Sequence, residues 1–288
     1  MLIQTKIERL FSIVFSEKII KGFEKYILYF ASLGFVIHLL LILLSNNNII
    51  DLSMVDSKLL SNPISALYTP FSFILVYEAF LLIYFIPRSF TTAVGKQYEI
   101  ISLIIIRKIF GDIPLVDLNA NWVQNSNNLQ LVYDLVGILI IFFLIYLFRR
   151  AKEKLPFKTV SEKLDRFIAS KKLLSIILLP ILLGICILSF ISWYNGVFIS
   201  NSFDQNLNYL FFNEFFTLLI VVDVFILLLS FQYTERYSQL IRNTGFIIST
   251  ILLRLSFSTV GLTSIVLIIS GIVFGLLILL IYNAIERE

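Results

Sequence analysis

The sequence predicts an all-α integral membrane protein with eight transmembrane helices in two parallel four-helix repeats. An amphipathic interfacial segment is expected before each repeat. The 288 residues are 58% hydrophobic and only 15% charged, whereas a soluble domain is about half apolar and about a quarter charged. The apolar residues gather in blocks of about 20, the length that crosses a bilayer. A motif with an arginine inside an apolar segment occurs twice, as IISLIIIRKIF (100–110) and IISTILLRLSF (247–257).

The elements follow one another in a regular order. Residues 1–25 carry apolar side chains at helical spacing and predict a helix lying in the membrane interface. The eight spans are expected at about 26–45, 64–86, 97–110, 129–148, 173–193, 210–231, 243–257 and 262–282. Between the fourth and fifth lies a basic linker, 149–172, with nine Lys and Arg and a second, weaker amphipathic pattern. The two repeats are therefore expected to be 1–148 and 149–288.

The distribution of basic residues predicts the orientation. Of the 23 Lys and Arg, 19 fall in segments on one side of the eight predicted spans, and the opposite loops hold only Lys58. Basic loops stay in the cytoplasm, so both termini are expected there. The short third segment must then cross, because otherwise the nine-charge linker would lie outside. We expect a bacterial cytoplasmic membrane.

The repeat extends beyond the arginine motif. Glu78 in the second predicted span matches Asp223 in the sixth, 145 positions later. Three residues of the motif recur 147 positions later, and these are Ser102 with Ser249, Arg107 with Arg254, and Phe110 with Phe257. Both halves enter the membrane from the same side, since each has four spans. This relation predicts a parallel repeat about an axis near the membrane normal.

Each half places an acid and an arginine at a similar depth. At 1.5 Å per residue, all four side chains lie about 15–19 Å from the inner surface. Charges at that depth face the bundle interior and pair with one another. We therefore expect two ion pairs, Glu78 with Arg107 and Asp223 with Arg254. A buried pair can take part in permeation or gating, or it can serve only to fix helix register.

Other polar residues are weaker candidates. His38 lies about 19 Å deep and is a possible proton relay, although a satisfied interior histidine is the alternative. Ser102 and Ser249 are accessory polar residues, expected in packing or interhelical hydrogen bonds. Gly271-x-x-x-Gly275 suits close helix packing, within or between chains. Nearer the span ends, hydration is expected for Glu99, Asp134 and Glu214.

Enzyme motifs are absent from the sequence. One cysteine and one histidine leave no metal cluster and no intrachain disulfide, and there is no phosphate-binding glycine loop. We expect no enzyme activity, no cofactor, no metal and no nucleic-acid partner. The expected partners are the lipid bilayer, anionic lipid at the linker between Arg149 and Lys172, and a second copy or another subunit of a membrane complex.

The leading functional hypothesis is a transporter or channel whose permeation or gating element includes the charge pairs. The arginines favour an anion, whereas the carboxylates and His38 favour protons or cations. The alternative is a non-transporting scaffold, assembly factor or accessory subunit in which the pairs only hold the halves in register. A hydrated cavity reaching Arg107 and Arg254 would favour transport, and dry, closed packing would favour the scaffold.

Overall fold

A computed structural model describes residues 2–47, 63–113, 116–117, 119, 121–122, 124–154, 162–198, 207–234, 236–259 and 261–286. These residues form helices and connecting loops, with no strand among them. In chain order the helical elements are α1 (Leu2–Val14), α2 (Glu17–Asn46), η1 (Pro63–Leu67), α4 (Tyr68–Tyr84), α5 (Phe90–Asp112), α6 (Ser126–Lys152), α7 (Glu162–Phe198), α8 (Leu207–Phe231), α9 (Tyr237–Leu255), η3 (Ser256–Ser258) and α10 (Leu262–Ile285).

Seven of the described helical segments are long and apolar enough to cross a membrane. They include all or most of α2, α4, α6, α7, α8, α9 and α10, and correspond to seven of the eight predicted spans. Helix α5 is not among them, because its 23 residues include five charged ones. The chain is thus an all-helical, multi-pass membrane protein.

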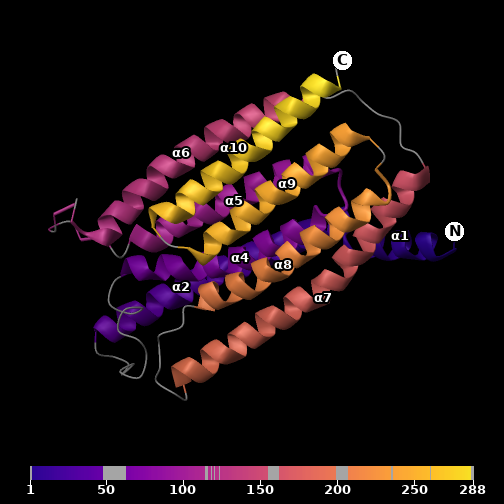
Figure 1. The fold of residues 1–288 in the computed structure, drawn as a ribbon. Helices are drawn as coiled ribbons and strands as arrows, with labels where there is room; N and C mark the ends of the chain where they lie inside the picture. The colour runs from indigo at the N-terminus through magenta and orange to yellow at the C-terminus, as the bar shows by residue number, and fades with distance from the viewer. Residues whose placement is uncertain are drawn as a thin grey trace.

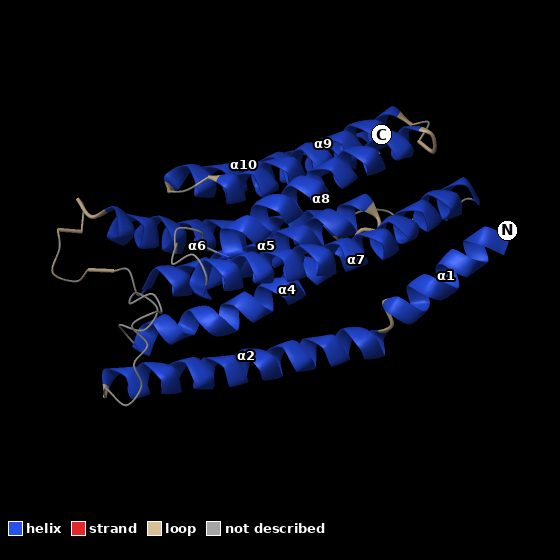
Figure 2. Ribbon diagram, turned by 90° about the horizontal axis from the view of Figure 1, so that it is seen from below, coloured by secondary structure: helices blue, strands red, loops and turns tan. Residues whose placement is uncertain are grey.

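The long helices run side by side in one bundle, with both chain termini near the same end (Figure 1). Helices α5 and α9 pack against each other in the middle of the bundle, and α6 packs against α10. Helix α4 lies between α2 and α5, and α8 lies between α7 and α9. Figure 2 shows α2 along one edge of the bundle, where it packs mainly on α4.

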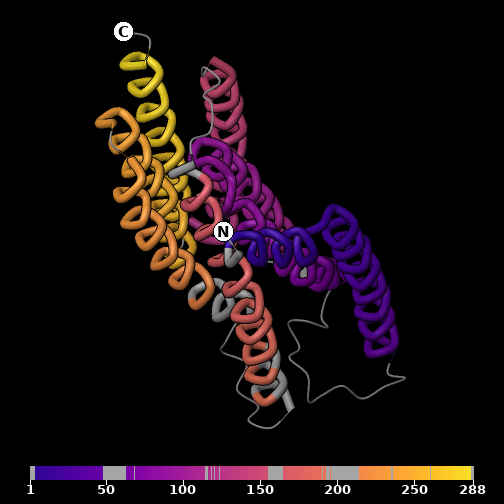
Figure 3. The backbone as a smooth tube through the Cα atoms, turned by 90° about the vertical axis from the view of Figure 1, so that its right-hand side faces the viewer, coloured from indigo at the N-terminus to yellow at the C-terminus, as the bar shows by residue number. Residues whose placement is uncertain are grey.

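The N-terminal boundary differs from the prediction. The expected interfacial helix over 1–25 ends at Val14, and α2 already begins at Glu17. The break arises at Ser16, whose hydroxyl accepts a hydrogen bond from the backbone amide of Ile19 at 3.3 Å and so caps α2. After this break α1 turns away from the axis of α2 (Figure 3) and packs against α7.

The expected interfacial segment before the second repeat is also different. Helix α7 is continuous from Glu162, through Pro180, to Phe198, so residues 162–172 extend the fifth span. The remainder of that amphipathic pattern, at Leu155 and Val160, lies outside the described residues. Side chains near the start of α7 pack inside the bundle, and Phe167 is buried there. Because this face of α7 packs inside the bundle, these residues are part of the long helix and not of a separate interfacial segment.

The third predicted span is longer than expected. Instead of 97–110, α5 covers Phe90–Asp112, and its N-cap is Ser89, whose hydroxyl accepts a hydrogen bond from the amide of Thr92. Its first turns contain Thr91 and Gln97, which are polar and nevertheless buried. A hydropathy pattern underestimates the length of such a helix, because neighbouring helices and not lipid surround these polar side chains.

Candidate functional site

The first predicted pair forms between α4 and α5. Glu78 and Arg107 are only 2% and 8% exposed, and Arg107 Nη2 lies 3.8 Å from Glu78 Oε2. Arg107 Nη1 also donates to the backbone oxygen of Phe71 at 3.2 Å. No hydrogen-bond donor among the described residues reaches Glu78 Oε2. The two side chains meet, but the ion pair is loose.

The second predicted pair forms between α8 and α9 and is tighter. Arg254 Nη1 lies 2.6 Å from Asp223 Oδ2, and these residues are 2% and 3% exposed. The hydroxyl of Thr250, one turn before Arg254, donates to the same carboxylate oxygen at 2.7 Å. A hydroxyl donor and a guanidinium therefore converge on one carboxylate oxygen inside the bundle, and the Arg254 Nη1 contact is an ion pair without hydrogen-bond geometry.

Arg254 also links the two halves of the chain. Its Nη2 donates to the side-chain oxygen of Gln97 on α5 at 3.4 Å. Gln97 itself is buried. The guanidinium thus contacts α8 and α5 from its place on α9, so it joins helices that are far apart in the sequence.

A second buried hydrogen-bond chain lies at the same α5–α9 contact. Ser249 donates to the backbone oxygen of Gly271 on α10 at 2.6 Å. The serine hydroxyl has one proton, so Tyr98 on α5 donates to Ser249 Oγ, at 2.6 Å. A Cβ placed on Gly275 would lie 1.8 Å from the Tyr98 hydroxyl. The space beside the two glycines of Gly271-x-x-x-Gly275 is therefore filled within this chain by α9 and by Tyr98.

The other sequence candidates lie apart from the pairs. Ser102 donates to the backbone oxygen of Glu99 in its own helix. His38 on α2 lies 2.6 Å from the hydroxyl of Thr69 on α4. Thr69 precedes Glu78 by nine residues, about 13 Å along the helix. The structure brings the four predicted charges together in two pairs and places His38 toward the other end of α4.

The expected hydration of Asp134 is wrong, and Lys171 of the predicted linker is also buried. Asp134, expected to be hydrated, is 1% exposed and forms an ion pair with Lys108, whose Nζ lies 3.3 Å from Asp134 Oδ2. Lys171, assigned to the basic linker, is 3% exposed and donates to the backbone oxygen of Arg88. Its ammonium lies over the rings of Phe90 and Phe167, each at 5.1 Å. The one sequence signal for this burial is Phe167, four residues earlier on the same helix face.

Two cations of the predicted basic linker contact protein groups, and Lys171 is the first of them. The next residue, Lys172, is paired with Glu8 of α1 at 3.3 Å. Both cations are thus engaged by protein groups. Residues 155–161 of the linker, including Lys158, lie outside the described residues.

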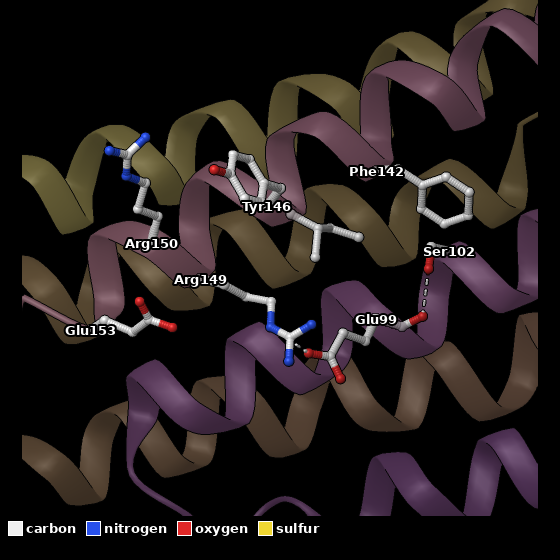
Figure 4. A pocket seen from close by; sticks show the side chains of 8 residues that line it. Glu99, Ser102, Phe142, Tyr146, Arg149, Arg150 and Glu153 are labelled. Carbon is white, nitrogen blue, oxygen red and sulfur yellow. Dashed lines mark hydrogen bonds and ion pairs between the residues drawn. The ribbon is translucent and has the colours of Figure 1, made fainter.

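A groove between α5 and α6 has a volume of about 610 Å³ (Figure 4). It is lined by Glu99, Ser102, Phe142, Ile145, Tyr146, Arg149, Arg150 and Glu153. The four central charged residues are not part of its wall. Across the described residues, no cluster of three or more His, Cys, Asp or Glu is placed to hold a metal ion.

Comparison of the chain with protein-family models, with curated proteins and with solved structures found no match.

Proposed function

We propose that this protein is a non-transporting membrane component, a scaffold or accessory subunit of a membrane complex. Its buried charge pairs hold the helices in register. The observation that carries this proposal is the position of Arg254, which is 2% exposed and contacts Asp223 on α8 and Gln97 on α5. A guanidinium that contacts side chains of two other helices holds those helices together.

Closed packing around both pairs supports this function over transport. A permeation path brings polar side chains into contact with water, whereas the four paired residues are 2–8% exposed. Tyr98 and Ser249 close the α5–α9 contact with further buried hydrogen bonds. The low exposure of the four charged side chains thus supports the closed packing that the scaffold hypothesis expects.

The proposed architecture has eight spans, with α5 as the third. Its 23 residues extend about 34 Å, enough to cross the hydrocarbon core of about 30 Å. Helices α4, α6 and α9 pack around it. Arg107 is paired within this packing. A helix surrounded by protein can cross with charges that a lipid-exposed helix could not carry.

The proposed repeats, 1–148 and 149–288, are supported by helix boundaries and packing order. Helices α5 and α9 begin at Phe90 and Tyr237, 147 positions apart, which is the offset of the arginine motif. The contacts run α2–α4–α5–α6 in one half and α7–α8–α9–α10 in the other. The halves are not identical, because α7 also packs on α4 and α1. Superposition of the halves in an experimental structure should give a rotation near two-fold about the membrane normal.

The proposed setting is a bacterial cytoplasmic membrane with both termini in the cytoplasm. The termini lie near the same end of the bundle (Figure 1), and the 19-to-1 distribution of loop cations supports that orientation. No catalytic activity is part of this proposal, and the partner is a second copy or another membrane subunit.

A transporter or channel is the second candidate function, favoured by the loose pair in the first half. Glu78 Oε2 has no hydrogen-bond donor among the described residues, and Arg107 is 3.8 Å away. A loosely paired carboxylate near the middle of a membrane is a place where a proton or cation can bind. The arginines would instead favour an anion.

Flux measurements in liposomes separate the two functions. Purified protein would be reconstituted and tested for proton, potassium and chloride flux with pH- and potential-sensitive dyes, beside protein-free liposomes. The scaffold proposal expects flux equal to that of the empty liposomes. A flux that disappears in Arg107→Gln, in a variant that still folds, would refute the scaffold and establish transport.

A further inference from the structure

The groove between α5 and α6 has the size and position of a lipid site. Its volume of about 610 Å³ falls within the range of roughly 300–1,000 Å³ that is typical of small-molecule sites. It is formed by the N-terminal half of α5 and the C-terminal half of α6. Phe142, at its far end, precedes the end of α6 by ten residues, about 15 Å. The groove therefore extends from one membrane surface about halfway across the hydrocarbon core.

The α6 side of the groove changes from apolar to charged along one helix face. Its lining residues follow at intervals of three and one, which places them on a single stripe. In order they are Phe142, Ile145, Tyr146, Arg149, Arg150 and Glu153. A phospholipid has the same order, with acyl chains toward the bilayer centre and its phosphate at the surface.

The groove is open to the bilayer. The lining side chains Phe142 and Tyr146 are 45% and 56% exposed. In Figure 4 these rings project from α6, and Glu99 and Ser102 face them from α5. An acyl chain can therefore lie along the two rings without displacing any helix.

Cations predominate at the surface end of the groove. Glu99 is shared by two of them, with Lys96 Nζ at 2.7 Å and Arg149 Nε at 3.6 Å. The side chain of Arg149 is 66% exposed, so this ion pair contributes little free energy and leaves other guanidinium donors available. Arg150 has no ion pair among the described residues. Arg149 and Arg150 both line the groove, and in Figure 4 their side chains leave α6 in different directions. An arginine side chain has several rotatable bonds, so either guanidinium can turn toward a phosphate at this end of the groove and bind it through paired hydrogen bonds.

We propose that this groove binds one anionic phospholipid, such as phosphatidylglycerol. Arg149 and Arg150 hold its phosphate, and one acyl chain lies along Tyr146 and Phe142. The site selects anions because its cations outnumber its acids. Lys96 and Lys152 flank the groove beside Arg149 and Arg150, and the acids in its lining are Glu99 and Glu153. The site is independent of the function proposed for the central charge pairs.

Native mass spectrometry of the purified full-length protein tests the site. Protein in detergent is titrated with phosphatidylglycerol or with phosphatidylethanolamine of identical acyl chains, and the first bound lipid is quantified. Removal of two cations near an anionic headgroup should weaken binding by about 30-fold, roughly fivefold for each. We therefore expect Arg149→Gln/Arg150→Gln to lose the first phosphatidylglycerol, whereas Lys18→Gln/Lys21→Gln, two exposed cations on α2, should retain it.

A second measurement does not depend on the arginine variants. Tyr146→Trp in a Trp122→Phe/Trp193→Phe background should be quenched by phosphatidylglycerol with brominated chains, and soluble glycerol phosphate should not relieve the quenching. Unchanged lipid retention in the arginine double variant would overturn the proposal, as would equal loss in the lysine control. Equal binding of phosphatidylethanolamine would overturn the anionic class. Relief by glycerol phosphate would assign the groove to a soluble phosphate compound.

Discussion

Arg254 Nη1 lies 2.6 Å from Asp223 Oδ2, whereas in the first half Arg107 Nη2 lies 3.8 Å from Glu78 Oε2. The same pattern of acid and arginine thus gives a tight pair and a loose one. Thr250 holds the Asp223 carboxylate from a second direction, and the backbone oxygen of Phe71 draws part of the Arg107 guanidinium away. The two pairs should therefore differ in strength.

The tight pair should show strong energetic coupling. Asp223→Asn or Arg254→Gln alone strands a buried charge and should reduce the free energy of unfolding by about 3–5 kcal/mol. The double variant should lose less than the sum of the two, because neither charge is left alone. A double-mutant cycle in detergent measures the coupling, and a value indistinguishable from zero would contradict the pairing.

The loose pair should be coupled more weakly. Glu78→Gln should destabilise the protein less than Asp223→Asn does, since the Glu78 carboxylate has fewer partners in the described part of the chain. The same double-mutant cycle with Arg107→Gln gives the coupling energy. Glu214→Gln, which removes an exposed acid on α8, should leave the unfolding free energy within about 0.5 kcal/mol of wild type. Coupling equal to that of the second pair would show that the difference in distance has no energetic consequence.

Gly275→Ala should destabilise the contact between α5 and α10. The new Cβ would lie 1.8 Å from the Tyr98 hydroxyl, and overpacking of this kind typically costs about 1–3 kcal/mol. Tyr98→Phe removes the hydroxyl and should restore part of the loss in the double variant. Gly184→Ala is the matched control, because nothing lies within 4 Å of a Cβ there. The thermal unfolding temperatures of these four variants are compared with that of wild type. A Gly275→Ala variant as stable as wild type would mean that α5 and α10 separate readily at this contact.

Cysteine labelling should establish whether α5 crosses the membrane. In a Cys186→Ser background, single cysteines at Asn47 and Asn119 should react with a membrane-impermeant maleimide from outside, because both side chains are exposed beyond helix ends. A cysteine at Lys154, just after α6, should react only after the membrane is permeabilised. Labelling of Lys154 from outside would mean that α5 does not cross and that the bundle has seven spans.

The sequence by itself determined the membrane class, seven of the apolar segments and the partners within each charge pair. Apolar blocks of span length require a bilayer, whatever their later packing. A fixed rise per residue sets the depth of each charge, so an acid and an arginine at the same level could be paired before any helix was placed. Glu78 met Arg107 and Asp223 met Arg254 for this reason.

The tertiary structure alone decided which helix faces meet. The hydrogen bonds from Tyr98 to Ser249 and from Arg254 to Gln97 join residues 151 and 157 positions apart, and no local pattern encodes such distances. The burial of Lys171 against Arg88 and Phe90, and the position of the charged helix α5 in the middle of the bundle, also depend on contacts between distant segments. The break at Ser16, in contrast, comes from a local cap. Depth is a property of one helix and its spacing, whereas rotation about the helix axis depends on the side chains of its neighbours.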